Sequence, residues 1–159
     1  MPRTHPQAPV PAAVTLRRAT LQDLAAIEAL ERASFRSDRL SHRALRHWLR
    51  AANGLFLVAV SAGQLLGCAL AVQRSDSTAA RLYSIAIARA ARGQGLGTRL
   101  LKTMERRLRA DGFSALRLEV AVNNAAAIAM YSKQGYRVFG RKPGYYQDGR
   151  DALRMQKPL

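Results

Sequence analysis

The sequence predicts a single α+β domain in which helices cover a mostly antiparallel sheet. The chain has 159 residues, which suits one hydrophobic core rather than two. Hydrophobic residues make up 48% of the chain, enough to build that core. Segments that alternate apolar and polar residues occur together with segments of helical periodicity, and no internal repeat or linker separates them. These observations favour one folded unit with mixed secondary structure.

The segment before the first predicted strand differs in composition from the rest. Residues 1–14 hold four of the six prolines and lack the apolar stretch of a signal peptide. We therefore expect a flexible N-terminal tail over residues 1–13 and the domain over residues 14–159.

The first half of the domain predicts a strand, two helices and a hairpin. Val14 to Arg18 alternates as a strand does, and Thr20 to Asp23 resembles a capping box that opens a helix. Ser41 can cap the second helix. The segments 55–60 and 64–74 read as strands joined across a short turn that contains glycine.

The second half alternates strands with helices. Arg81 to Ala88 predicts a strand, and Gly95 to Asp111 predicts a long helix with an apolar stripe, closed by Gly112. Strict alternation over Ser114 to Val122 predicts the next strand, with Glu119 on its polar face. A short alanine-rich helix over 124–134 and two strands, 136–141 and 151–155, complete the domain, and the last two are separated by a turn near 148–149.

Basic residues dominate the charge, with 26 lysines and arginines against 10 acids and a formal net charge of +16. This excess is compatible with an anionic partner such as nucleic acid, an acidic peptide or a phosphorylated cofactor. The alternative is compositional drift, because 22 of the cations are arginine and alanine is abundant. Six arginines on predicted helices are either solvated faces or a docking surface: Arg43, Arg46, Arg50, Arg106, Arg107 and Arg109.

Few residues suggest metal or thiol chemistry. The single cysteine, Cys68, lies in an apolar run and predicts a small buried hydrophobe in a reducing, cytoplasmic setting. The three histidines, His5, His42 and His47, have no ligand spacing, so we expect no metal. No apolar run approaches the roughly 20 residues of a membrane span, so we expect no membrane partner.

The most informative segment is the glycine-rich run from Arg92 to Gly97, between a predicted strand and the long helix. Glycines let a ligand approach the backbone, and a helix N-terminus offers free N–H groups to a phosphate. The spacing is neither that of a dinucleotide fingerprint nor that of a P-loop. The alternative is a tight connection without a ligand.

Arg-x-x-Gly-x-Gly after a strand resembles the acetyl-coenzyme-A loop of the GNAT superfamily of N-acetyltransferases. The segments Leu118–Val120, Asn124–Tyr131 and Gly135–Tyr136 resemble the bacterial ribosomal-protein-alanine N-acetyltransferases, and Tyr145 to Gly149 is typical of protein N-terminal acetyltransferases. The resemblance is strong from about Arg81 onward and weaker before Val60. It implies the GNAT acyltransferase fold, with a mostly antiparallel sheet of about seven strands flanked by about four helices.

The resemblance also implies a binding site for acetyl-CoA as cosubstrate. Backbone groups at the end of the strand 81–88 would hold the pantetheine arm, and amides of the loop 92–98 would hold the pyrophosphate. Asn124 would contact pantetheine, cap its helix, or do both. The residues implied are Ile85, Ala86, Ile87, Arg92, Gly93, Gln94, Gly95, Leu96, Gly97, Thr98, Asn124 and Tyr131.

Two residues match the family's acid–base pair. Glu119 matches the general base and Tyr131 the general acid, which fits a direct attack of an amine on a thioester. Tyr131 lies seven residues after Asn124, two helical turns on, so both project from nearly the same face. The alternatives are a solvated surface charge for Glu119 and a half-buried core residue for Tyr131.

Four aromatic residues match positions that contact the acceptor. These are Phe35, Tyr83, Tyr145 and Tyr146. Read as neighbours on a strand, Tyr145 and Tyr146 would point to opposite faces, so that one of them reaches the substrate. The segment Phe35–Leu40 departs from the sequence of the alanine acetyltransferases, which puts the acceptor in doubt rather than the chemistry.

Three functions compete on this evidence. The leading hypothesis is transfer of acetyl to a protein amine, most of all an N-terminal α-amino group, with a ribosomal protein as the natural target. The second is acetylation of lysine or of a small-molecule amine, against which the charge speaks mildly where the substrate is a polycation. The third is a basic module that binds nucleic acid or senses CoA, although no aromatic platform interleaves the arginines.

Overall fold

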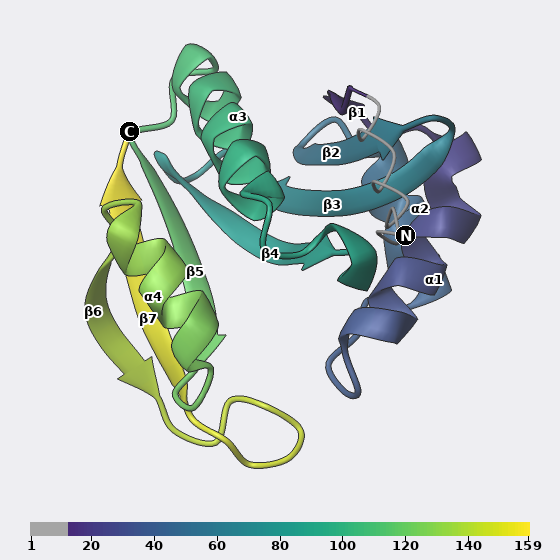
Figure 1. Cartoon of the computed structure of the whole chain (residues 1–159). Coiled ribbons are helices and arrows are strands. Elements are labelled where there is room, and N and C mark those ends of the chain that lie inside the picture. Colours follow the sequence, from purple (N-terminus) through teal and green to yellow (C-terminus); the bar gives the residue numbers. More distant parts are fainter. Residues whose placement is uncertain (1–12) are drawn as a thin grey trace, which may run out of the picture.

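Seven strands form one sheet across residues 13–159, the part of the chain that this computed structural model describes (Figure 1). The strands are β1 (Thr15–Arg18), β2 (Gly54–Ser61), β3 (Gln64–Val72), β4 (Ala79–Ile87), β5 (Ala115–Ala121), β6 (Arg137–Lys142) and β7 (Ala152–Pro158). The helices are α1 (Leu24–Ser34), α2 (His42–Arg50), α3 (Leu96–Ala110) and α4 (Ala125–Lys133), with single 3₁₀ turns η1 (Leu21–Asp23) and η2 (Arg89–Ala91). The expected α+β architecture is confirmed, while most of the predicted flexible tail (1–13) lies outside the described residues.

The strand order is β1-β2-β3-β4-β5-β7-β6, and every neighbouring pair is antiparallel except β4 and β5. Parallel neighbours need a crossover connection, which α3 supplies. The last strand, β7, inserts between β5 and β6. The sheet is therefore mixed, and the crossover between its parallel strands β4 and β5 includes the glycine-rich loop as well as α3.

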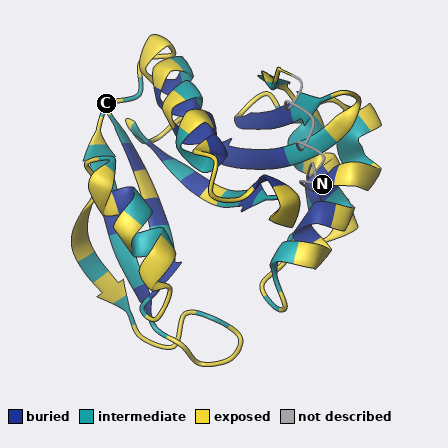
Figure 2. Ribbon diagram, in the orientation of Figure 1, coloured by how far each residue is buried: buried dark blue, intermediate teal, exposed yellow. Residues whose placement is uncertain are grey.

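Both faces of the sheet are covered (Figure 2). One core lies under α3 and α4 and includes Leu57, Leu100 and Leu118, while a second lies under α1 and α2 and includes Ile27 and Phe56. Because alternate residues of a strand point to opposite faces, β2 and β3 contribute to both cores. This explains why these strands are almost continuously apolar rather than alternating.

The predicted element boundaries need small corrections. The helix expected to open at Thr20 starts with η1 before α1 begins, although the Asp23 carboxylate does accept the backbone N–H of Thr20 at 2.8 Å. The Ser41 hydroxyl caps α2 as expected, accepting the N–H of Ala44 at 3.1 Å. Strand β4 begins two residues early, and β7 continues to Pro158 because pairing with β5 runs along its whole length.

Candidate active site

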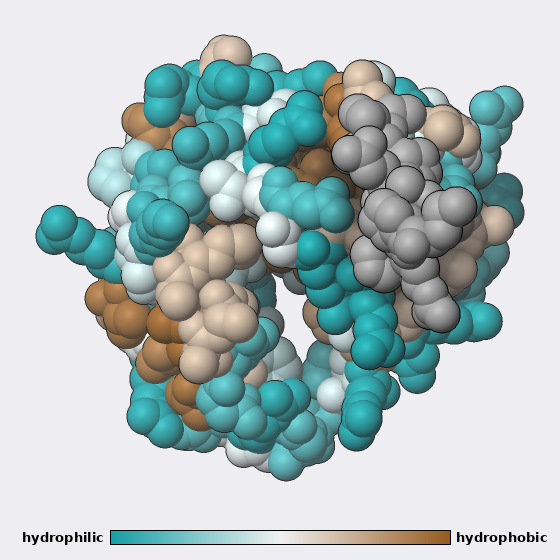
Figure 3. All heavy atoms as spheres, in the orientation of Figure 1, coloured by the Kyte–Doolittle hydropathy of each residue, from teal (hydrophilic) through white to brown (hydrophobic). Residues whose placement is uncertain are grey.

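Strands β4 and β5 form a fork. They pair only at Ala79 with Ala115, Ala80 with Leu116, and Arg81 with Arg117. Beyond Arg81, β4 continues to pair with β3, whereas β5 continues to pair with β7. The two strands therefore separate, and Figure 3 shows an opening through the molecule below β4, between α4 and α1. A ligand can enter the sheet here without displacing strand pairs.

The glycine-rich loop borders the fork at the N-terminus of α3. Gly93 and Gly95 have φ near +77° and +76°, and a Cβ at either would meet no atom within 4 Å. None of the backbone N–H groups from Gly93 to Thr98 donates a hydrogen bond to another described residue. Free N–H groups beside the positive end of a helix dipole suit a pyrophosphate.

The predicted cofactor residues divide into backbone and side-chain contributors. Ile85 and Ile87 pack toward the α3 core, and Ala86 belongs to the α1–α2 core, so these three can contact a ligand through their backbone. Leu96 is likewise a core side chain with only its amide available. The Arg92 Nε donates to the carbonyl of Ile87 at 3.1 Å, which ties the loop to the end of β4.

The Glu119 carboxylate lies among three cations, and its side chain is only 7% exposed. Arg81 Nε donates to Oε2 at 3.0 Å. Lys142 Nζ and Arg154 Nε lie 3.6 and 3.7 Å from Oε1, beyond normal hydrogen-bonding distance. The solvated-surface alternative for Glu119 is therefore wrong, and Oε1 retains lone pairs that can accept a proton.

Tyr131 is 6% exposed and packs edge-on against Tyr136, with 5.6 Å between ring centroids. Its hydroxyl makes no hydrogen bond to any other described residue. Burial, and to a smaller extent the nearby Tyr146, raises the pKa of Tyr131 well above its ordinary value. A hydroxyl that stays protonated and has no partner can donate a proton or a hydrogen bond.

Asn124 caps α4, because its Oδ1 accepts the backbone N–H of Ala127 at 3.2 Å. The capping alternative is thus confirmed. The amide Nδ2 of Asn124 is not used by the cap, so its side chain can still donate to a ligand.

Tyr83 is the extra residue of a β-bulge in β4, because its two chain neighbours pair with consecutive residues of β3. The bulge turns its ring toward the α1–α2 side, where it packs edge-on against Trp48 of α2, with 5.8 Å between centroids. The Arg81 guanidinium lies 5.0 Å from the Tyr83 ring centroid. With 44% of its surface exposed, Tyr83 is partly available to a substrate.

Tyr145 and Tyr146 lie in the loop between β6 and β7, so the interpretation as strand neighbours is wrong. The rings contact each other edge-on, with 5.0 Å between centroids. Arg81 Nη2 donates to the Tyr145 hydroxyl at 2.6 Å. Burial, followed by the neighbouring Tyr145 and Glu119, raises the pKa of Tyr146 to about 12. Tyr146 therefore lies close enough to interact electrostatically with Glu119, the predicted base. It interacts in the same way with Tyr131, the predicted acid.

The segment after α1 meets the same loop. The Asp38 carboxylate accepts the backbone N–H of Gln147 at 3.3 Å, joining residues 109 positions apart. Phe35, at the end of α1, is half-buried against the α1–α2 core. Two segments predicted to contact the acceptor are thus brought together on one side of the sheet.

Sequence reasoning missed Arg81 and Glu31. Arg81 is the only charged residue of the predicted strand 81–88, and that isolation was the available signal. Glu31, 2% exposed, sits four residues after Ile27 on the buried stripe of α1. Its Oε1 accepts the Ser84 hydroxyl at 2.6 Å, and burial raises the pKa of this carboxyl. Glu31 thereby anchors the end of α1 to β4 beside the bulge.

The described residues give little support to thiol chemistry, a metal site or a membrane span. Cys68 is 1% exposed, and burial raises the pKa of its thiol to about 12, so it packs as a hydrophobe rather than acting as a thiolate. Within residues 13–159 no three His, Cys, Asp or Glu side chains gather as a metal site would require. No helix in that range is both long and apolar enough to cross a membrane.

A forked mixed sheet with free amides at the fork can hold a ligand that carries a pyrophosphate. Residues 21–136 match the model of the acetyltransferase (GNAT) family, and the chain belongs to that family. An uncharacterized N-acetyltransferase of Methanocaldococcus jannaschii is 34% identical over 143 residues, covering 89% of this chain and 90% of that protein.

Two further similar proteins are named as acetyltransferases of proteins. The N-terminal acetyltransferase A complex catalytic subunit of Arabidopsis thaliana is 31% identical over 153 residues, covering 92% of this chain and 78% of that protein. The crystal structure of the ribosomal-protein-S18-alanine N-acetyltransferase from Escherichia coli superposes with a TM-score of 0.84 and 27% identity, covering 92% and 94% of the two chains. The chain is an acetyl-CoA-dependent N-acetyltransferase.

Proposed function

We propose that this enzyme acetylates the α-amino group of a protein N-terminus, with Glu119 as general base and Tyr131 as general acid. The observation that carries the proposal is the grouping of Tyr83, Tyr145 and Glu119 around one arginine, Arg81. Aromatic rings from two distant segments thus flank a carboxylate beside the fork. Flat rings beside a proton acceptor suit an extended peptide whose first amine must lose a proton.

The acetyl donor, acetyl-CoA, fits the residues at the fork. Acetyl-CoA supplies a thioester whose carbonyl carbon an amine can attack. The free amides from Gly93 to Thr98 would hold its pyrophosphate, the backbone of residues 85–87 would run beside its pantetheine arm, and Asn124 would donate to it. The open space around Gly93 and Gly95 supports a close approach of the ligand to the backbone.

Glu119 removes the proton from the incoming amine. An α-amine has a reference pKa near 8, so an appreciable fraction is neutral at physiological pH and a modest base suffices. As the nitrogen bonds to the thioester carbon, its extra proton passes to Oε1 of Glu119, the oxygen without a close hydrogen bond, directly or through water. Arg81 holds the other oxygen, which keeps the carboxylate oriented.

Tyr131 assists the leaving group. When the carbon–sulfur bond breaks, the departing thiolate needs a proton or a hydrogen bond. The Tyr131 hydroxyl is protonated, free of partners among the described residues and buried on the face of α4 that begins with Asn124. Two helical turns separate the two residues, so one helix face can line the thioester channel.

The acceptor is inferred from the walls of the site and from the relatives. A lysine amine, with a reference pKa near 10.4, would demand more of the base than an α-amine does. Relatives named as acting on ribosomal protein S18 and on protein N-termini favour a protein acceptor, with a ribosomal protein as the first one to test. Cytoplasmic localisation remains a prediction.

Three acceptors tested side by side with the full chain would decide the question. The first is a peptide with a free N-terminus and no lysine. The second is the same peptide with a blocked N-terminus and one lysine, and the third is a polyamine. CoA release and product mass should show acetylation of the first with the highest kcat/KM. Equal or higher kcat/KM for lysine or polyamine would overturn the proposed acceptor and favour the alternative of a lysine or small-molecule acetyltransferase.

A further inference from the structure

The outer face of α3 carries an unneutralised row of cations. The helix buries Leu96, Leu100, Leu101, Met104 and Leu108, so its basic residues lie on the outer face, where all are exposed except the half-buried Arg107. These basic residues are Arg99, Lys102, Arg106, Arg107 and Arg109. Within residues 13–159, none of them forms an ion pair. The one acid of the helix, Glu105, is buried, where it binds Lys157 and Tyr136 instead.

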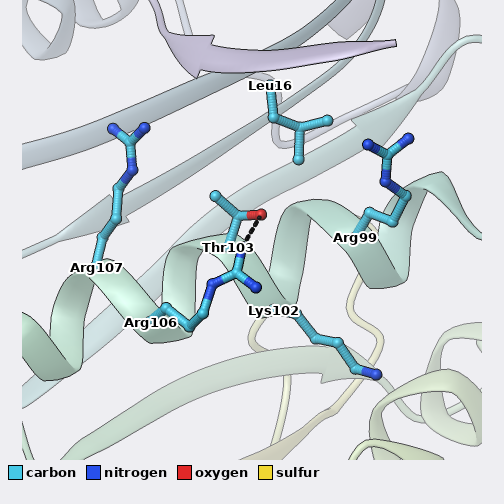
Figure 4. A pocket seen from close by; sticks show the side chains of 6 residues that line it. All are labelled: Leu16, Arg99, Lys102, Thr103, Arg106 and Arg107. Carbon is cyan, nitrogen blue, oxygen red and sulfur yellow. Dashed lines mark hydrogen bonds between the residues drawn. The ribbon is translucent and has the colours of Figure 1, made fainter. Parts of the chain in front are cut away.

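This face is hollowed rather than flat. A pocket of about 450 Å³ lies between α3 and β1, lined by Leu16, Arg99, Lys102, Thr103, Arg106 and Arg107 (Figure 4). Arg99 and Arg107 project toward β1 in this view, while Lys102 points away from it. Two helical turns separate Arg99 from Arg107, about 12 Å along the axis. The Arg106 Nη2 donates to Thr103 Oγ1 at 3.2 Å, which holds one guanidinium over the helix.

The side chains on the outer face of α3 indicate which class of anionic partner this face can bind. The exposed large hydrophobic residues of the described chain are Leu21, Tyr83, Val138, Phe139 and Tyr145, and none belongs to α3 or β1. Membrane-surface helices and protein interfaces need apolar contact area, which this face lacks. Single-strand readers need aromatic rings on which bases stack, also absent from this face. Guanidinium and ammonium groups along a groove suit phosphates that follow one another along a nucleic-acid backbone.

The location of the face leaves the acceptor site free. Tyr83 and Trp48 lie on the α1–α2 side of the sheet, whereas α3 covers the opposite side. A large polyanion bound to the middle of α3 would therefore not cover the acceptor residues. We propose that the α3 face, defined by Lys102, Arg106 and Arg107 with Arg99, docks this enzyme onto the sugar-phosphate backbone of double-helical RNA. The docking does not depend on which amine the enzyme acetylates.

The test compares two triple variants of the full chain. In one, Lys102, Arg106 and Arg107 are changed to Gln, which removes charge but keeps a good helix former. In the matched control, Arg43, Arg46 and Arg50 of α2 are changed to Gln; these arginines line a second basic pocket on the other side of the sheet. Arg99 is left unchanged because it adjoins the loop expected to bind acetyl-CoA.

Binding is measured by fluorescence anisotropy with a synthetic RNA duplex of about 16 base pairs, a length that a double-stranded RNA-binding domain spans. Salt is varied from about 50 to 200 mM, with saturating acetyl-CoA present throughout. The wild type and the α2 control should lose affinity with rising salt. The α3 variant should bind at least about tenfold more weakly and show a salt slope lower by about 2 to 3, since each lost phosphate contact contributes roughly 0.9. Its CoA release with a short free peptide should stay at the wild-type level.

Several results would overturn the docking proposal. They are a salt slope unchanged in the α3 variant, an equal loss in the α2 control, binding that saturating acetyl-CoA abolishes, and binding to anionic phospholipid vesicles or polyglutamate but not to RNA. Wild-type peptide acetylation by the α3 variant shows that it has folded. Failure of the docking proposal would leave the acceptor assay unaffected.

Discussion

Arg81, the last residue of β4 that pairs with β5, places its Nε 3.0 Å from Oε2 of Glu119, which lies two residues beyond the last paired residue of β5. The same guanidinium donates to the Tyr145 hydroxyl at 2.6 Å. One side chain therefore bridges the fork and ties the proposed base to the loop that holds Tyr145, a residue of the proposed acceptor site. The guanidinium can do both at once because its donors form a rigid planar fork.

Changing Arg81 to Met should lower kcat by about 100-fold, because a displaced catalytic group costs about that much. Changing it to Lys should restore only part of the rate, since one ammonium replaces the planar group that now contacts Glu119 and Tyr145. Initial rates with acetyl-CoA and a free-amine peptide provide the measurement. Arg117→Met is the matched control, because Arg117 pairs in register with Arg81 but contacts Gln156 and Phe139 instead. Wild-type kcat in Arg81→Met would show that the contact does not position the base.

Glu119→Gln should reduce kcat by about 10- to 1000-fold, since an amide keeps the shape but cannot take the proton. The substitution also leaves Arg81, Lys142 and Arg154 without their shared carboxylate, so some loss of stability is expected. Rates are therefore measured well below the melting temperature of the variant. Glu28→Gln, which weakens the contacts of this carboxylate with Arg32 and His42 away from the proposed site, is the control and should keep full activity. Undiminished turnover in Glu119→Gln would remove the residue from the mechanism.

Tyr131→Phe should also lower kcat by about 10- to 1000-fold with acetyl-CoA. Its melting temperature should change little, because the hydroxyl has no hydrogen-bond partner among the described residues. Tyr136→Phe is the opposite case. It loses the buried hydrogen bond to Glu105 Oε2 at 2.7 Å, so it should lose about 1 to 3 kcal/mol of stability while kcat stays near wild type.

A thioester with a better leaving group should restore part of the rate of Tyr131→Phe and none of that of Glu119→Gln. Equal rescue of both variants would contradict the assigned roles.

Gly95→Ala should raise the KM for acetyl-CoA. The residue has φ near +76°, where a Cβ costs about 1 to 2 kcal/mol, and its added methyl would occupy the open space above the free amides. Gly112→Ala is a matched control, because Gly112 has φ near +91°, also faces open space and lies at the other end of α3. Both variants should lose similar stability, and only Gly95→Ala should alter KM. A KM shift of the same size in both variants would mean that backbone strain, not ligand contact, is responsible.

Glu31→Gln should become more stable relative to wild type as the pH rises. Burial raises the pKa of Glu31, so the native state holds its proton more tightly than the unfolded state does. Its contribution to stability is full below the ordinary value of 4.5 and is lost as the pH rises through the raised native pKa. Glutamine does not titrate and can still accept the Ser84 hydroxyl. Melting temperatures of both proteins at pH 4 and pH 8 measure the difference, and a difference that does not change with pH would contradict this assignment.

Much of the candidate site could be predicted from short stretches of sequence. The loop around Gly95 can be recognised in the sequence because a strand, glycines and an amphipathic helix follow one another without interruption. Glu119 falls on the polar face of a strictly alternating strand, and Asn124 and Tyr131 share a helix face through their spacing of seven. Each of these inferences depends on neighbours within about two helical turns, which local geometry determines.

The sequence by itself determined the order of the elements and the glycine-rich loop, because propensity and periodicity act locally. Its resemblance to a known family supplied the acid–base candidates. Only the tertiary structure decided what those candidates face. The insertion of β7 between β5 and β6, the fork beyond Arg81, and the placement of Tyr145 in a loop depend on pairings between distant segments. Arg81 meets Glu119 across 38 residues and Tyr145 across 64, and Asp38 meets Gln147 across 109. Contacts of that separation arise when the whole core packs, so no short pattern in the chain records them.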